Sequence, residues 1–235
     1  MIDVEALRAR FPTLARKVYF QNGGYGLLSL DGKAALEQYI TDRLEHGSVW
    51  GDWAVRTELI REKFARLLNA TPDEIALVSS ASAGINSIAS AVSFDAGRDK
   101  VVVSNYEYPT SGQIWHAQAS RGARVVHVEE DAAGLIPLSH FEAAIDDSTR
   151  VAAISDVCYR TGAKLDVAGV VRIAHEHGAI VVLDCFQSAG VLHLDMRELG
   201  VDVAISGTQK YLLGSSGLAF MYVNAALIEA LTPTV

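Results

Sequence analysis

The lysine Lys210 lies in the stretch "ISGTQKYLLGSSG" (205–217), between a short apolar segment and a glycine-rich turn. A lysine amine forms Schiff bases with carbonyl compounds, and burial tunes its pKa for that chemistry. Most lysines, however, are solvated on the protein surface. What Lys210 can do therefore depends on the residues that the fold brings close to it.

Three other features could accompany this lysine. Asp184 follows an apolar run, and it either faces a cationic ring nitrogen or caps the following turn. The segment "SSASAGIN" (79–86) opens a predicted helix, which suits a phosphate, although a helix cap by Ser80 or Ser82 has the same pattern. Tyr108 could stack on a flat ligand or pack in the core.

The elements that position these residues follow from the hydrophobic pattern. Short apolar runs without alternation are typical of strands buried on both faces of a parallel sheet. Amphipathic stretches such as 165–178 separate them, so we predict an α/β fold, a mostly parallel seven-stranded sheet with helices on both faces. The predicted strands cover residues 74–80, 100–105, 123–128, 150–156, 179–184, 202–206 and 218–223. The last one follows a short turn, and we expect it to run antiparallel.

All four features follow predicted strands, and ligands of open α/β sheets bind at the carboxyl ends of strands. Pyridoxal phosphate needs an amine for a Schiff base, an acidic partner for its pyridine nitrogen and an anion site. We therefore predict pyridoxal 5'-phosphate as the cofactor. A nucleotide-binding domain is disfavoured, because neither GxGxxG nor GxxxxGK[ST] occurs in the sequence.

The first 70 residues differ from the rest of the chain. A loop rich in glycine and asparagine (19–29) precedes two helical patterns, at 30–46 and 54–69. We predict an N-terminal arm with helices over 1–70 and a cofactor-binding large domain over 71–235. Since the sequence stops soon after a helix begins, we expect a smaller C-terminal domain to be absent from this chain.

Composition excludes other classes of function. Lys and Arg total 20 against 28 Asp and Glu, a net charge of -8, which argues against nucleic acid as a partner. No apolar run reaches the roughly 18 residues of a membrane span, and the first residues lack a signal-peptide pattern. Cys158 and Cys185 have no CxxC or metal-type spacing, and we interpret them as structural residues of a reduced protein. Together with the missing signal-peptide and membrane-span patterns, this predicts a cytoplasmic protein. His175 and His177 do not share a helix face, so we expect no metal site.

The segment "VVLDCFQSAGVLHLDMRELGVDVAISGTQKYLLGSSGLAFMYV" (181–223) resembles the class V aminotransferase family, which includes cysteine desulfurases, selenocysteine lyases and isopenicillin N epimerase-like proteins. "FQNGGYGLLS", "SSASAGINSIA" and "EYPTSGQIW" extend the likeness over nearly the whole chain. The resemblance implies a type I pyridoxal-phosphate-dependent transferase fold and a homodimer. It also implies an enzyme acting on an amino acid, by transamination or by cysteine desulfurase/lyase-like chemistry.

The resemblance implies a role for each matching residue. Lys210 would form the Schiff base and move a proton, and Asp184 would pair with the pyridine nitrogen. Gln187 would hydrogen-bond the phenolic oxygen, and Tyr108 would stack on the ring where desulfurases carry a histidine.

For the phosphate, the resemblance implies the backbone N–H groups of Ser82 and Ala83, helped by Thr208 and Gln209. Position 209 is a departure from the desulfurase branch, which usually has a histidine there. Another departure is "SDVCYRTG" (155–162), where desulfurases read "SHVSN". Arg160, in this segment, could bind a substrate carboxylate or lie on the surface.

A second hypothesis of a different class also stays open. The chain could be a non-catalytic or split subunit of this fold that needs a C-terminal partner chain. In the family, the C-terminal domain carries the main carboxylate-binding arginine and, in desulfurases, the sulfur-accepting cysteine.

Overall fold

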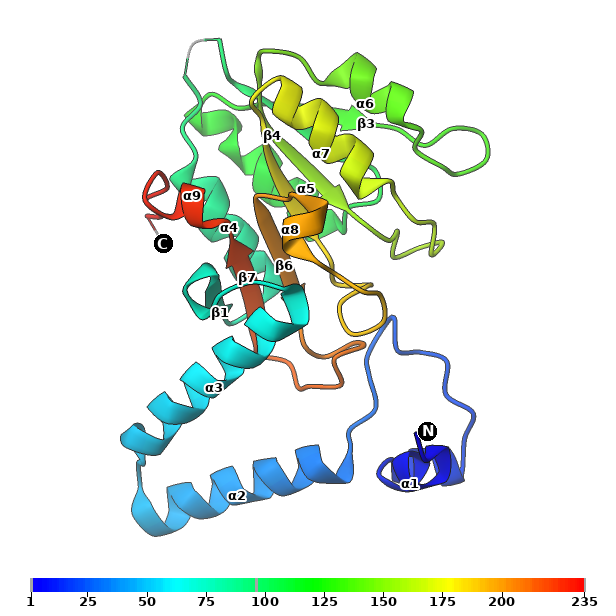
Figure 1. The fold of residues 1–235 in the computed structure, drawn as a ribbon, viewed down its shortest axis with the longest axis vertical. Coiled ribbons are helices and arrows are strands. Elements are labelled where there is room, and N and C mark those ends of the chain that lie inside the picture. Colours follow the sequence, from blue (N-terminus) through cyan, green and yellow to red (C-terminus); the bar gives the residue numbers. More distant parts are fainter. Residues whose placement is uncertain (1, 96, 235) are drawn as a thin grey trace.

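The computed structural model describes residues 2–95 and 97–234, and in them seven strands form one sheet in the order β1-β7-β6-β5-β4-β2-β3 (Figure 1). The strands are β1 (Ile75–Val78), β2 (Lys100–Ser104), β3 (Arg124–Val128), β4 (Thr149–Ser155), β5 (Ile180–Asp184), β6 (Val203–Gly207) and β7 (Ala219–Val223). Five neighbouring strands, from β6 to β3, run parallel, whereas β7 is antiparallel to both β6 and β1. The predicted fold class and the antiparallel last strand are both confirmed.

Helices cover both faces of the sheet because its central strands alternate buried side chains between two apolar clusters. One cluster joins Val102 and Ile154 to α7 (Val167–Glu176) and to the end of α3 (Trp50–Leu68). The other joins Val101 and Val103 to α4 (Ala81–Ala91) and α5 (Pro109–Ala117). The other helices of the described residues are α1 (Val4–Ala9), α2 (Leu30–His46), α6 (Leu138–Ala144), α8 (Met196–Leu199), α9 (Ala225–Ile228) and the short 3-10 helices η1 (Pro12–Ala15), η2 (Pro72–Glu74) and η3 (Gln118–Arg121).

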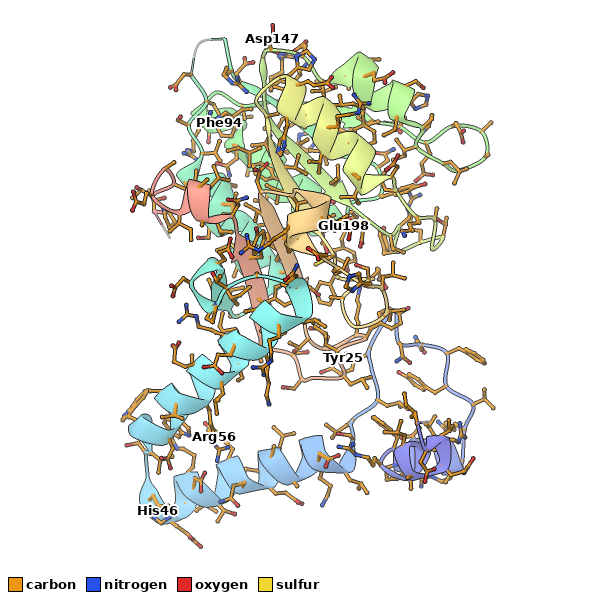
Figure 2. All side chains as sticks on the ribbon, viewed as in Figure 1. Tyr25, His46, Arg56, Phe94, Asp147 and Glu198 are labelled. Atoms are coloured by element: carbon orange, nitrogen blue, oxygen red, sulfur yellow. The ribbon has the colours of Figure 1, made fainter. Side chains whose placement is uncertain are left out.

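The N-terminal helices extend away from the sheet. Among the described residues, α1 and α2 bury none of their own, and α3 buries side chains only near its C-terminal end, where Phe64 packs on Phe220 of β7 with ring centroids 4.8 Å apart. His46 and Arg56, labelled in Figure 2, lie far from the sheet. The boundary predicted at residue 70 remains a prediction. No helix among the described residues is long and apolar enough to cross a lipid bilayer.

Candidate active site

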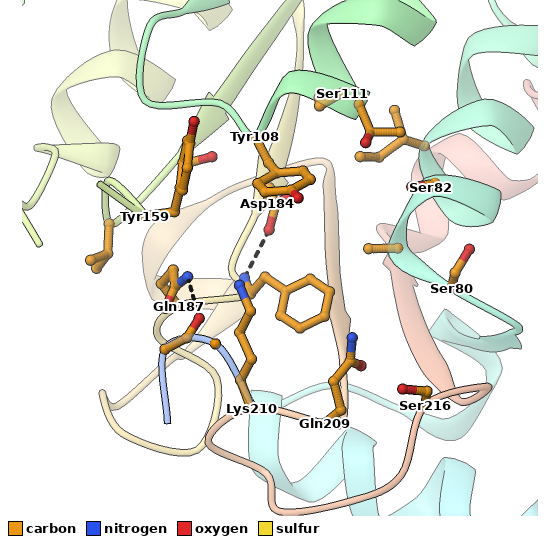
Figure 3. A pocket seen from close by; sticks show the side chains of 18 of the residues that line it. Ser80, Ser82, Tyr108, Ser111, Tyr159, Asp184, Gln187, Gln209, Lys210 and Ser216 are labelled. Atoms are coloured by element: carbon orange, nitrogen blue, oxygen red, sulfur yellow. Dashed lines mark hydrogen bonds between the residues drawn. The ribbon is translucent and has the colours of Figure 1, made fainter. Parts of the chain in front are cut away.

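A pocket of about 520 Å³ opens at the carboxyl ends of the parallel strands, a size in the range of small-molecule sites (Figure 3). Four neighbouring strands each supply lining residues at or just after their ends, and four of these side chains could take part in chemistry. In sheet order these are Lys210 after β6, Asp184 at the end of β5, Tyr159 after β4 and Tyr108 after β2. The parallel topology therefore brings together residues that are up to about a hundred positions apart in sequence.

The amine and the carboxylate influence each other in this pocket. In Figure 3 the side chain of Lys210 extends toward Asp184, and its Nζ lies 4.5 Å from the centroid of the Phe186 ring. Burial lowers the pKa of Lys210, while the charge of Asp184 opposes that shift. Burial also raises the pKa of Asp184 to about 6, opposed by a 2.8 Å hydrogen bond from the Phe186 N–H and by the charge of Lys210. The pair is a partly desolvated amine beside a buried carboxyl group.

Glycines allow the close packing around Lys210. A Cβ atom on Gly207 would lie 2.3 Å from Cζ of Phe186, so the absence of a side chain there makes room for the ring beneath the amine. Gly26, in the N-terminal loop, donates its N–H to the carbonyl of Gln209 at 2.6 Å. The loop predicted at 19–29 is thereby held against the segment that carries Lys210.

The start of helix α4 forms another wall of the pocket. Residues 79–82 line it, and Ser80 is the N-cap, with its Oγ accepting from the Ala83 N–H at 3.0 Å. The cap interpretation thus holds for Ser80, while the helix N-terminus still points its positive dipole end at the pocket. Ala83 itself is not among the lining residues.

Aromatic and amide groups complete the pocket. The rings of Tyr108 and Tyr159 meet edge to face, with centroids 5.1 Å apart. Gln187 donates through Nε2 to the Gly23 carbonyl at 3.1 Å and also lines the pocket, as does Gln209. Of the residues predicted from sequence, Ser82, Tyr108, Asp184, Gln187, Gln209 and Lys210 therefore lie together.

Two further predicted residues point elsewhere. Thr208 Oγ1 donates to the carbonyls of Ser215 and Leu218 at 2.9 and 3.1 Å, which holds the turn after β6. Arg160 donates to the Asn105 carbonyl at 3.0 Å and forms an ion pair with Glu130. Neither residue lines the pocket, and the roles expected for them remain predictions.

Sequence reasoning gave no role to several lining residues. Tyr159 lies in the segment 155–162 that departs from the desulfurase pattern, and neither it nor Ser155 nor Ser216 has a role predicted from sequence, although all three line the pocket. Ser216 is reached by Tyr25, whose Oη lies 3.0 Å from its Oγ. The signal for this contact was the "NGGYG" run, since glycines beside an aromatic residue indicate a close-packed loop.

The donor set matches the predicted cofactor. A helix N-terminus suits its phosphate, a buried carboxyl group suits a protonated ring nitrogen, and a partly desolvated lysine suits its aldehyde. A Tyr108 ring at the pocket wall suits stacking on a flat ring. These residues fit pyridoxal phosphate by their chemistry.

Among the described residues, the cluster of three side chains that could ligate a metal ion lies outside this pocket. His175 and His177 pair with different carboxylates, Asp202 at 2.9 Å and Asp147 at 2.6 Å. His193, Asp195 and Glu198 each have one potential ligand atom within 4.8 Å of those of the other two. Both oxygens of Asp195, however, already accept hydrogen bonds, one from two backbone N–H groups of α8 and the other from Asn69.

A family model described as Aminotransferase class-V matches residues 47–235. The chain is similar to an uncharacterized aminotransferase, YcbU, of Bacillus subtilis (strain 168), at 33% identity over 229 residues, 97% of this chain and 61% of that protein. A probable cysteine desulfurase of Methanothermobacter thermautotrophicus is 34% identical over 173 residues, 74% of this chain and 43% of that protein.

The solved structure of the cysteine desulfurase CsdA from Escherichia coli matches with a TM-score of 0.87 at 26% identity, covering 100% of this chain and 61% of that one. This chain thus spans less than two thirds of the length of these proteins. The resemblance stated from sequence is confirmed.

Proposed function

The chain belongs to the aminotransferase class-V family, and we propose that it functions in a pyridoxal-phosphate enzyme that acts on an amino acid. In this proposal Lys210 is the residue that binds the cofactor covalently. The observation that carries this proposal is the meeting of Lys210, Asp184 and the start of α4 in one pocket. When bound, pyridoxal phosphate supplies an electron-withdrawing ring that stabilises negative charge developing on an amino-acid substrate.

Each of these residues has a task in this proposal. Asp184, in its ionised form, would hold a proton on the ring nitrogen by its charge. Backbone N–H groups at the start of α4, with Ser82 among them, would bind the phosphate, and Tyr108 would cover one face of the ring. Gln187 would donate to the phenolic oxygen.

The environment of Lys210 supports its role. Burial lowers the pKa of its ammonium group, so a larger fraction is the neutral amine that acts as a nucleophile or accepts a proton. The Phe186 ring at 4.5 Å from Nζ restricts water on one side of the amine.

The direct test is the visible absorbance of the purified chain with pyridoxal phosphate. We expect a band in the wild type that is absent in Lys210→Ala. Lys164→Ala, which changes an exposed lysine outside the pocket, is the matched control and should keep the band. Borohydride reduction followed by peptide mass spectrometry should place the cofactor on Lys210.

A band that persists unchanged in Lys210→Ala would overturn the role of this lysine. If neither protein shows a band, the chain does not assemble the site alone, and the alternative of a subunit that needs a partner chain gains support. If the band forms but no amino acid shifts it, a binding role without turnover is favoured.

The reaction within the family is also a proposal. We favour transamination or cysteine desulfurase/lyase-like chemistry on an amino acid, in a homodimer, as the family implies. Amino acids that shift the band can be screened for release of sulfide or of a keto acid, which separates the two reactions. Sedimentation velocity measures the oligomeric state.

A further inference from the structure

Three buried carboxyl groups meet at the edge of the sheet that bears the pocket. Glu107 follows β2, Asp156 follows β4, and Asp184 ends β5, and they are 9%, 3% and 8% exposed. These strands are consecutive neighbours in the sheet. Within residues 2–95 and 97–234, neither Glu107 nor Asp156 forms an ion pair with a lysine or arginine.

Glu107 is linked to Asp184 through one serine. Ser155 Oγ donates to Glu107 Oε1 at 2.6 Å, and Ser155 is the direct cross-strand neighbour of Asp184 in the β4–β5 pair. Ser155 lines the main pocket, whereas Glu107 lines an adjoining cavity of about 240 Å³, and Tyr108 lines both. Glu107 therefore stands in the wall between the two spaces.

The charges around Glu107 favour its neutral form. The titratable groups that face Glu107 or its cluster are Asp156, Asp184, Cys185 and Lys210, together with His116 and His127 in the adjoining cavity. Burial, and then the negative charge of Asp184, raises the pKa of Glu107 to about 8, although hydrogen bonds from Ser111 and Ser155 oppose the shift. Burial raises the pKa of Asp156 only to about 6. Of the three groups, Glu107 therefore has the pKa that is raised most.

We propose that Glu107 is a positioning residue that stays protonated at neutral pH and thereby leaves the negative charge of the cluster on the aspartates, above all on Asp184 beside Lys210. An ionised Glu107 would repel the charge on Asp184 and return a proton to it. The assignment of Asp184 to the cofactor nitrogen rests on the proposed function, whereas the protonation of Glu107 does not.

The first test follows stability against pH in the chain without cofactor, for wild type and Glu107→Gln. A pKa raised to about 8 in the folded state, above the ordinary 4.5, means that only the folded chain holds this proton between those values. The stability that this proton adds is then fully present below the ordinary pKa of 4.5 and is lost as the pH rises through the folded-state pKa of about 8. We expect the urea midpoint of wild type to fall more steeply over this window than that of Glu107→Gln.

Glu74→Gln is the matched control. Glu74 is also buried, at 3% exposed, and burial opposes its ionisation, but hydrogen bonds from Thr71 and Ala225 and the charge of Arg197 outweigh that effect and lower its pKa. The stability that ionised Glu74 adds is present at neutral pH and is lost only at acid pH, as its pKa is lowered. Glu74→Gln should therefore keep the wild-type dependence of the urea midpoint on pH between the two pKa values of Glu107. An equal slope in wild type and Glu107→Gln would overturn the proposal.

The second test is carboxyl-carbon NMR, which gives the titration midpoints of Glu107 and Asp184 directly in the wild type. We expect Glu107 to titrate near pH 8, and we expect the midpoint of Asp184 to be nearly unchanged in Glu107→Gln. A marked fall of the Asp184 midpoint in that variant would mean that Glu107 is charged, and it would overturn the proposal. Adding pyridoxal phosphate separates the two proposals. Without a visible band, this chain does not hold the cofactor by itself, while the titration midpoint of Glu107 still decides the present inference.

Discussion

Gly26 shows how a single missing side chain determines the contact between the N-terminal loop and the Lys210 segment. A Cβ atom at this buried position would lie 2.1 Å from the backbone carbonyl oxygen of Lys210. We expect Gly26→Ala to destabilise the chain by about 1–3 kcal/mol, because backbone must move to relieve the overlap. The same movement should weaken binding of pyridoxal phosphate. Urea denaturation and a cofactor titration measure the two effects.

Gly51→Ala is the control for this change. Gly51 lies in helix α3 with nothing within 4 Å of the added atom, so alanine should gain up to about 1 kcal/mol from its helix propensity. If Gly26→Ala behaves like Gly51→Ala, the contact between the loop and Lys210 is not formed in solution.

At the scale of residues, sequence predicted the members of the pocket better than their orientation. Lys210 and Asp184 could be placed because each stands at or just after the end of an apolar strand. Thr208 has the same neighbourhood in sequence, yet its hydroxyl bonds the backbone of the turn at residues 215 and 218. Which way a side chain points in a turn depends on backbone donors and acceptors that have no signature in the sequence.

Helix α4 allows the capping and the anion-binding properties of one element to be separated. Ser80→Ala removes an N-cap and should cost about 1 kcal/mol of stability. Because this cap lies in the pocket wall, the frayed helix start should also reduce the increase in melting temperature that pyridoxal phosphate produces. Thermal melts with and without the cofactor measure both effects.

Ser29→Ala provides the comparison, since Ser29 caps helix α2 through the same kind of bond, to the Gly32 N–H at 3.0 Å, outside the pocket. It should cost no more stability than Ser80→Ala, because α2 buries no residue, and it should leave the effect of the cofactor unchanged. Equal effects of both variants on the response to cofactor would argue against a phosphate site at α4.

At the scale of elements, hydrophobic pattern located all seven strands but could not order them. Runs such as the one in β5 report burial on two faces, which is a local property. The pairing of β1 with β7 joins residues about 145 positions apart, Ile75 with Tyr222 at one end, and depends on the whole chain packing together. The reversed direction of β7 was predictable because a short turn cannot hold a crossover helix.

The whole molecule divides into a well-packed sheet and a poorly anchored N-terminal part. Large apolar side chains are exposed along the N-terminal helices, namely Leu36, Tyr39, Ile40, Leu44, Trp50 and Val55. Apolar surface of this kind is typical of a face that packs against another partner. The homodimer proposed above would have such a face available, and the longer relatives have additional residues that this chain does not span.

Hydrogen exchange of the backbone amides tests this division. Helices in proteins are held mainly by tertiary packing, and α2 buries no residue, whereas α7 buries five. We expect amides of α2 to open with a free energy of roughly 0–2 kcal/mol, and those of α7 and β5 with values near the global stability of about 5–15 kcal/mol. Helix α7 is the internal control measured in the same sample, and since it has 10 residues against 17 in α2, greater protection of α7 would not come from helix length. Amide protection of α2 equal to that of α7 would contradict the expectation. If that protection were lost when the protein is diluted, a second copy of the chain would be what packs on α2.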